Sequence, residues 1–211
     1  MCGYWNVNAM AFHINFYPII HPMRFLELRY VAYIKDTNQI FDYSEKPVVV
    51  PIGKGLLYNF LEKALQDVEP GKSYRFVFIK PFGERKDDLI KIIPLSEFVR
   101  RGVRPFPGLI VNVDGRRGVV LSISGGRVIV DFNHPVAGKD LVYEIEVIRE
   151  VKDLKDKIQG LLSFLFGIDR EKITVDINDK NIKIIVNGKE LPQEYKELLK
   201  KIMDDLKDYS L

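Results

Sequence analysis

The sequence has few of the residues that disulfide-bonded and metal-binding proteins need. Its 211 residues include one cysteine, Cys2, and three histidines. A single cysteine cannot form an internal disulfide and is typical of a reducing compartment, so we expect a cytoplasmic protein. The same scarcity excludes a zinc finger and a His-rich metal tail. We therefore expect neither a metal nor a cofactor.

The sequence also lacks a strong charge excess and a long hydrophobic run. The 32 basic and 29 acidic side chains leave a formal charge of +3. This weak excess argues against specific nucleic-acid binding, although a pI near 8.8 permits loose electrostatic contact. No apolar segment is long enough to span a bilayer, so we expect no membrane partner. With 46% hydrophobic residues, the chain can bury a core as one large domain or two to three small ones.

The first 22 residues, MCGYWNVNAMAFHINFYPIIHP, are aromatic and uncharged. A signal peptide would begin with basic residues and continue with an unbroken apolar segment, so this pattern excludes one. Regular strand patterning begins only at Arg24 and Phe25. We interpret residues 1–23 as an N-terminal extension, either an added strand or the product of an upstream start codon. In the second case Met23 would be the first biological residue.

The next part of the chain combines strand patterns with one helical pattern. The segment LLYNFLEKALQDV has apolar residues on one helical face, and Pro70-Gly71 ends it, so we expect a helix over 56–67. Alternating or short apolar runs predict strands at 25–35, 40–42, 48–51 and 74–79.

The middle of the chain has a different pattern, with short strands and tight turns. Asp114-Gly115 and Gly125-Gly126 are strong hairpin signals. One helical turn is expected over 95–99. The predicted strands are 89–93, 109–113, 118–123 and 127–132.

The pattern changes again after a predicted strand over 141–148. LKDKIQGLLSFLFG is an amphipathic helix ending at Gly167, and a last helix is expected over 193–207 with an apolar stripe. Two strands, 172–177 and 182–186, lie between them. This predicts a compact α-β-β-α module.

Four motifs follow one another in a specific order. They are FDYS at 41–44, IGKGLLYNFLEKALQDVEPGKSYRF at 52–76, PFG at 81–83 and VDFNHPVAGKDLVYEIEV at 130–147. In this order they resemble the SlyD-like and archaeal long-form FKBP-type peptidyl-prolyl cis-trans isomerases. The resemblance implies an α+β fold, in which an FKBP-type antiparallel half-barrel wraps one helix and is interrupted by a β-rich flap domain.

The resemblance also implies domain boundaries. Residues 24–84 and 134–150 would form the FKBP domain, 85–133 the inserted flap, and 151–211 the C-terminal α-β-β-α module. The corner from Asn133 to Lys139 would then return the chain from the insert to the interrupted sheet.

Position by position, the resemblance implies an apolar, aromatic site for a proline ring. Asp42 would be the carboxylate at its edge and would orient a carbonyl or a neighbouring hydroxyl such as that of Tyr33. The implied catalytic residues are Tyr33, Asp42, Phe82 and Tyr143. The implied substrate-binding residues are Phe41, Val50, Leu57, Tyr58 and Leu61, with Phe98, Phe106, Leu109 and Val111 in the insert. From the residues alone, most of these side chains would be core residues, and Asp42 could start a turn.

The sequence departs from the family at this site. Leu61 stands where a large aromatic residue forms the floor, Phe60 stands in place of glycine, and Tyr58 replaces a branched aliphatic residue. Phe82 replaces a tyrosine and so lacks a hydroxyl donor. One such hydrogen bond is worth about 0.5–1.5 kcal/mol, which predicts lower activity rather than none. Phe60 could compensate for Leu61 if the helix is slightly rotated.

These features lead to three functional hypotheses. The first is a prolyl isomerase with chaperone activity, whose insert captures unfolded or nascent polypeptides containing proline. The second is a catalytically silent FKBP-like chaperone or adaptor that binds peptides. The third is a ribosome-associated factor that uses basic turns such as DGRRG. His134, which precedes Pro135, is interpreted as a turn residue, since no motif places a Ser, Cys or carboxylate partner beside it.

Overall fold

The computed structural model describes residues 23–211, so the interpretation of residues 1–22 lies outside the described residues. The chain divides into two compact units. The first comprises the described residues up to Phe78 together with Val142–Leu211, and the second is Ile79–Leu141. None of the helices within 23–211 is long and apolar enough to cross a membrane.

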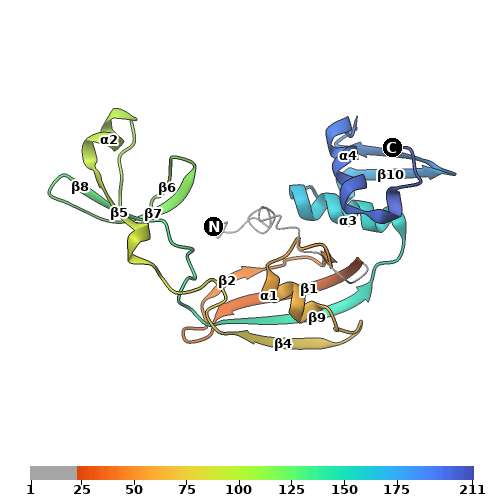
Figure 1. Cartoon of the computed structure of the whole chain (residues 1–211), viewed down its shortest axis with the longest axis horizontal. Coiled ribbons are helices and arrows are strands. Elements are labelled where there is room, and N and C mark those ends of the chain that lie inside the picture. The colour runs from red at the N-terminus through yellow and green to blue at the C-terminus, as the bar shows by residue number, and fades with distance from the viewer. Residues whose placement is uncertain (1–22) are drawn as a thin grey trace. The chain divides into compact units, whose positions relative to one another are not determined.

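A curled antiparallel half-barrel sheet forms the base of the first unit (Figure 1). Its strand order is β2-β1-β9-β4, with β3 also paired to β1. β1 pairs with β3 along its first half and with β2 along its second half. The strands are β1 (Arg24–Ile34), β2 (Ile40–Tyr43), β3 (Val48–Ile52), β4 (Ser73–Phe78) and β9 (Leu141–Glu150). The five predicted strands are thus confirmed to within two residues.

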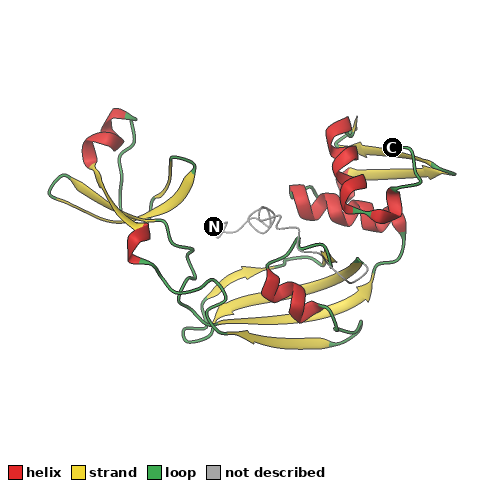
Figure 2. Cartoon of the chain, viewed as in Figure 1, coloured by secondary structure: helices red, strands yellow, loops and turns green. Residues whose placement is uncertain are grey.

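Helix α1 (Asn59–Leu65) lies across this sheet (Figure 2) and buries Leu61 and Leu65. The prediction of a helix over 56–67 was too long. The buried carboxylate of Glu62 accepts hydrogen bonds from the backbone N–H groups of Gly53 at 2.8 Å and Leu57 at 3.3 Å. These bonds satisfy the backbone of the preceding loop without a helical turn, so the helix begins only after Tyr58.

The C-terminal module contains two helices and a small sheet. Helix α3 and the strands were predicted correctly, but the short strand β12 was not. The last helix was predicted to continue to residue 207, and this was wrong: it ends at Ile202, and Met203 adopts an extended backbone. This break allows both Met203 and Leu206 to be buried, at 1% and 0% exposure. The elements are α3 (Leu154–Phe166), β10 (Ile173–Asn178), β11 (Asn181–Val186), β12 (Lys189–Glu190), α4 (Gln193–Ile202) and short 3-10 turns at Arg170–Lys172 and Asp204–Leu206.

Helix α3 packs against β3 of the half-barrel within the same unit. The contact depends on Gly160, since a Cβ atom there would lie 2.4 Å from Cγ1 of Val49. Ion pairs surround the contact. Arg170 Nη1 lies 3.0 Å from Oε1 of Glu27, and Arg149 Nη2 lies 2.9 Å from Oδ2 of Asp156.

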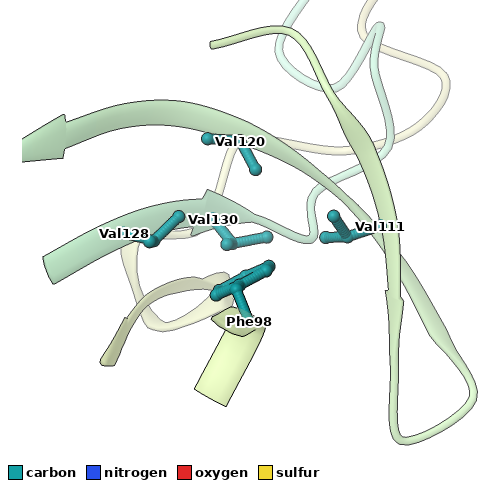
Figure 3. Packing of buried hydrophobic residues seen from close by; sticks show 5 residues of the cluster. All are labelled: Phe98, Val111, Val120, Val128 and Val130. Carbon is teal, nitrogen blue, oxygen red and sulfur yellow. The ribbon is translucent and has the colours of Figure 1, made fainter. Parts of the chain in front are cut away.

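The second unit is a separate four-stranded sheet with its own core. The strand order is β5-β8-β7-β6, and all three pairings are antiparallel. Figure 3 shows the core, in which Phe98 from α2 packs against Val111, Val120, Val128 and Val130. The elements are a 3-10 turn at Asp87–Leu89, β5 (Ile90–Pro94), α2 (Leu95–Arg100), β6 (Ile110–Val113), β7 (Arg116–Ser124) and β8 (Arg127–Asp131).

Candidate active site

Aromatic side chains gather around Tyr143, which is 2% exposed and lies near the start of β9. The ring of Tyr30 stacks on it with centroids 6.5 Å apart. Three further rings meet it edge-on: Phe41 at 6.0 Å, Phe60 at 6.2 Å and Phe78 at 5.8 Å. We call these five residues the Tyr143 cluster. The outer four rings are half-buried, so they present apolar surface around a buried centre.

Strand alternation explains how these rings meet. On β1 the even-numbered positions 26, 28 and 32 are buried, which places Tyr30 on the same face. On β4 every second residue is aromatic, and Phe76 stacks near Phe78 at 6.1 Å. Phe60 comes from α1 and lies 4.7 Å from Phe78, centroid to centroid. Sheet and helix thus contribute rings to one cluster.

Asp42 brings a carboxylate to this apolar cluster. The Tyr30 hydroxyl donates to its Oδ2 at 3.1 Å. Burial raises the pKa of Asp42 to about 6, although the hydrogen bonds from Tyr30 and from the backbone of Tyr43 oppose the rise. The carboxyl group is therefore half-protonated at a mildly acidic pH and mostly ionised at neutral pH.

The charge of Asp42 affects the pKa values of three nearby tyrosines. Burial and then the Asp42 charge raise the pKa values of Tyr30, Tyr58 and Tyr143, so all three hydroxyls are protonated at physiological pH. Tyr58, immediately before α1, also stacks on Phe60 at 5.7 Å. The site therefore presents neutral hydroxyl groups beside one ionisable carboxyl group.

The predicted neighbour of Asp42 was wrong. Tyr33 donates instead to Oε1 of Glu144 at 2.8 Å, in an exposed position. Glu144 follows Tyr143 on β9, so its side chain points to the opposite face of the sheet. Tyr30 was missed, although the alternation of Leu26, Leu28 and Ala32 would have placed it on the buried face.

The other sequence-predicted residues of the first unit fall into two groups. Phe41, Asp42, Tyr58 and Tyr143 come together at the cluster. Val50, Leu57 and Leu61 are buried core residues. The ring of Phe60 joins the cluster beside Tyr143 and Phe78, whereas compensation for Leu61 stays a prediction. Phe76 and Phe78, the aromatic positions of β4, were missed.

The remaining predicted residues lie in the second unit. The ring of Phe82 stacks on that of His134. Phe98 and Val111 were expected to bind substrate, but they are buried in the core of the insert (Figure 3), and Leu109 packs against that core. Phe106, at 57% exposure, is accessible.

The arrangement is suited to binding an apolar group, with a carboxyl group and hydroxyls to orient one polar atom. Within residues 23–211, no group of three or more His, Cys, Asp and Glu side chains could hold a metal ion. The buried carboxylates of Glu62 and Asp131 are engaged by hydrogen bonds from neighbouring groups, so they stabilise loops.

Comparison with known proteins gives one matching family model and several relatives. Residues 91–136 match a family model described as "FKBP26, IF domain". The short-type peptidyl-prolyl cis-trans isomerase of Methanocaldococcus jannaschii is 31% identical over 116 residues, which cover 52% of this chain and 73% of that protein.

Two bacterial relatives give similar values. The SlyD peptidyl-prolyl cis-trans isomerase of Treponema pallidum is 33% identical over 139 residues, covering 61% of this chain and 77% of that protein. The FKBP-type 16 kDa peptidyl-prolyl cis-trans isomerase of Escherichia coli is 34% identical over 111 residues, covering 49% and 73%.

Proposed function

Because the chain belongs to the family of FKBP-type peptidyl-prolyl cis-trans isomerases, we propose that it accelerates rotation about X-Pro bonds at the Tyr143 cluster. The observation that carries this assignment is the ring of half-buried aromatic side chains around Tyr143, with Asp42 at its edge. Relatives of this kind are named isomerases, and the geometry suits the chemistry of amide rotation.

Amide rotation needs neither a nucleophile nor a metal. The barrier of about 18–20 kcal/mol arises because resonance is lost when the C–N bond twists. The planar amide is the more polar form, so an apolar, water-excluding surface favours the twisted amide over the planar one. The aromatic rings of the cluster provide such a surface and can hold the proline ring.

Asp42 and the neighbouring hydroxyls supply orientation. We assign to the half-buried Tyr58 the hydroxyl that fixes the substrate carbonyl. Asp42 holds Tyr30 in place, and the buried Tyr143 forms the base of the aromatic surface. Val50, Leu57 and Leu61 support these side chains from the core rather than touching the peptide.

The test is cis/trans exchange of a short proline tetrapeptide, followed by magnetisation-transfer NMR. We expect the wild type to accelerate the exchange and Asp42→Ala to lower the catalysed rate about tenfold. Tyr30→Phe should lower this rate a few-fold, because the hydrogen bond from the hydroxyl to the Asp42 carboxylate is lost. Tyr33→Phe is the matched control, since it removes the hydroxyl on the opposite face. An equal loss in the two tyrosine variants would contradict the assigned site.

We also propose that the insert captures unfolded or nascent proline-containing chains in the cytoplasm. The supporting observation is its exposed apolar surface. Val99 is 66% exposed, Ile92 63% and Phe106 57%, although the core of this small unit is complete without them. Such side chains suit weak, non-specific binding of extended apolar segments.

A catalytically silent chaperone and a ribosome-associated factor are the competing functions. Suppressed aggregation of an unfolded client without any acceleration of the tetrapeptide would identify the first. The second would use exposed Arg116 and Arg117 at the start of β7, directly after the turn that follows β6. It predicts co-sedimentation with ribosomes that is lost steeply as salt is raised.

A further inference from the structure

One segment of the insert combines exposed apolar side chains with arginines. We call residues 99–106, with the sequence VRRGVRPF, the Phe106 segment. It runs from the last turn of α2 into the loop that leads to β6, wholly within the second unit. Val99 is 66% exposed, Phe106 57% and Val103 39%. These side chains can meet a partner, since the core of the insert is complete without them.

The backbone of the Phe106 segment is fixed at the end of α2. The N–H of Val103 donates to the carbonyl of Phe98, and the N–H of Gly102 donates to that of Val99, both at 2.9 Å. Gly102 has a φ of 69°, the left-handed conformation that this type of helix end requires. Phe98 is itself a core residue (Figure 3). Val99 and Val103 are therefore held close together on a fixed backbone.

Prolines and the sheet fix the other end of the segment. Pro105 is buried, whereas Phe106 next to it is exposed. Pro107 restricts the backbone of Phe106 to an extended conformation. The N–H of Gly108 then donates to the carbonyl of Val120 at 2.8 Å, so the chain rejoins the sheet. The backbone around Phe106 therefore has little freedom left to lose when a partner binds, which favours binding.

The charged residues within the Phe106 segment are all basic. Arg100, Arg101 and Arg104 are exposed, and no acidic residue lies among them or in the loop that follows. Arg100 pairs with Glu97 one turn earlier, whereas Arg101 and Arg104 form no ion pair in the part of the chain that the structure describes. The second unit has eleven basic and seven acidic side chains, although the complete chain carries only +3. An acidic partner would therefore meet uncompensated positive charge.

We propose that the Phe106 segment selects stretches of unfolded polypeptide in which apolar residues lie beside aspartate or glutamate. Val99, Val103 and Phe106 provide the apolar contact, and Arg101 and Arg104 pair with the carboxylates. Cα atoms three residues apart lie within about 11 Å, so a stretch of about five residues can reach Val103 and Phe106 together. The inference rests on the proposed function, since it names the class of polypeptide that the insert captures, and it adds a charge preference to this weak apolar binding.

A polypeptide suits the Phe106 segment better than a nucleic acid does. Single-stranded nucleic acids bind where aromatic rings stack on successive bases. This segment has one exposed ring, and its other exposed apolar side chains are valines, which cannot stack on bases. Valines do make contact with the aliphatic and aromatic side chains of an unfolded chain.

The test compares two labelled peptides that contain no proline and differ only at their polar positions. Between the same Phe, Leu and Val residues, one peptide carries Asp and Glu and the other carries Ser and Gln. Binding to the full chain is measured by fluorescence anisotropy at physiological salt. We expect the acidic peptide to bind about three- to tenfold more tightly, because each exposed ion pair contributes a small gain.

Two double variants with the same change in net charge locate this preference. Arg101→Gln with Arg104→Gln should lower the affinity for the acidic peptide to that for the neutral peptide. Lys91→Gln with Arg127→Gln, at exposed positions on β5 and β8, is the matched control and should keep the preference. Phe106→Ser should weaken binding of both peptides by the same factor. An equal loss of preference in the two double variants would assign it to the overall charge of the insert and overturn the inference.

Competitors distinguish the class of partner. A uridine oligonucleotide tests nucleic acid, and vesicles of equal parts phosphatidylcholine and phosphatidylserine test a membrane surface. We expect unlabelled acidic peptide to displace the labelled peptide more effectively than either competitor does. Stronger displacement by the oligonucleotide or by the vesicles would mean that the arginines serve that partner, which would overturn the inference.

The peptides contain no proline, so the outcome is independent of isomerase activity. A preference for the acidic peptide in a chain that does not accelerate the tetrapeptide would leave the inference standing and the proposed isomerase function wrong. If both peptides bind equally well, capture by the insert stands and the charge preference is wrong. If neither peptide binds, the proposed capture fails and the inference falls with it.

Discussion

Asp42 brings a titratable group into the apolar Tyr143 cluster. Its pKa is raised because burial penalises the charged form more than the Tyr30 and Tyr43 hydrogen bonds favour it. The cluster is therefore less stable when Asp42 is ionised. This cost is consistent with a functional group, since a core residue at the same place would carry no charge.

Asp42→Asn tests this cost through the pH dependence of stability. Aspartate in the unfolded chain titrates near 3.8, whereas Asp42 in the folded protein titrates near 6. Between these values the folded state binds more protons than the unfolded state, so the wild-type free energy of unfolding falls as pH rises. The asparagine variant lacks this term. We therefore expect the difference in melting temperature, Asp42→Asn minus wild type, to increase from about pH 4 to about pH 6 and to stay constant above that range.

The measurement is thermal unfolding of both proteins at matched pH values. A difference in melting temperature that is the same at both ends of this range would contradict the raised pKa. A direct titration of the Asp42 carboxyl carbon by NMR gives the midpoint independently of unfolding.

Residue identities were the part of the site that sequence patterns predicted least well. Asp42 and Tyr143 were found from motifs, but Tyr33 was chosen in place of Tyr30. Both tyrosines lie on one strand, three positions apart, so they point to opposite faces. A motif shows which segment of the chain contributes to the site, whereas the two-residue period of a strand shows which face a side chain occupies. Only the strand period distinguishes Tyr30 from Tyr33.

Secondary-structure elements were easier to predict, because strong periodicity and Gly-containing turns mark them. All the strands of the half-barrel and of the insert were found. The errors occur where side chains outweigh local propensity. Glu62 accepts hydrogen bonds from the loop before α1, so this loop does not become helical. Burial of Met203 and Leu206 ends α4 at Ile202. Both depend on tertiary contacts that no local pattern encodes.

The packing of α3 on β3 leads to a prediction about Gly160. Within a helix, Gly→Ala ordinarily stabilises by about 1 kcal/mol. At this position the new Cβ would lie 2.4 Å from Cγ1 and 2.6 Å from Cβ of Val49. The Cβ of valine is attached directly to the backbone, so a rotamer change cannot relieve this crowding. We expect Gly160→Ala to lower the free energy of unfolding by about 1–3 kcal/mol, measured by chemical denaturation.

Ser163→Ala, on the same helix, is the control for helix propensity alone. Ser163 is half-buried, and we expect a change within about 0.5 kcal/mol. Stabilisation by Gly160→Ala would mean that α3 can move away from Val49 at little cost, which would contradict a close helix–strand contact.

Under the proposed function, the chain combines a site for proline in the first unit with a surface for unfolded protein on the insert. The sequence indicated this combination through the order of its motifs, but it did not distinguish the insert's core from its surface. Phe98 and Phe106 are both aromatic, belong to one segment and were both predicted to bind substrate. Phe98 fills the core, whereas Phe106, held between Pro105 and Pro107, does not. The difference arises from folding of the insert and not from residue type.

Separation of these two surfaces predicts different effects on small and large substrates. On the proposed function, a tetrapeptide needs only the Tyr143 cluster, whereas a protein chain that the insert captures would benefit from the high effective concentration that a linked binding surface provides. We expect Phe106→Asp to leave kcat/KM for the tetrapeptide unchanged and to reduce, by about tenfold, catalysis of a proline-limited refolding reaction. Val77→Asp, at an exposed apolar position of the half-barrel, is the matched control and should change neither rate. If Phe106→Asp slows both substrates equally, the insert acts on the site itself rather than on capture, and if it slows neither, capture does not depend on this exposed surface.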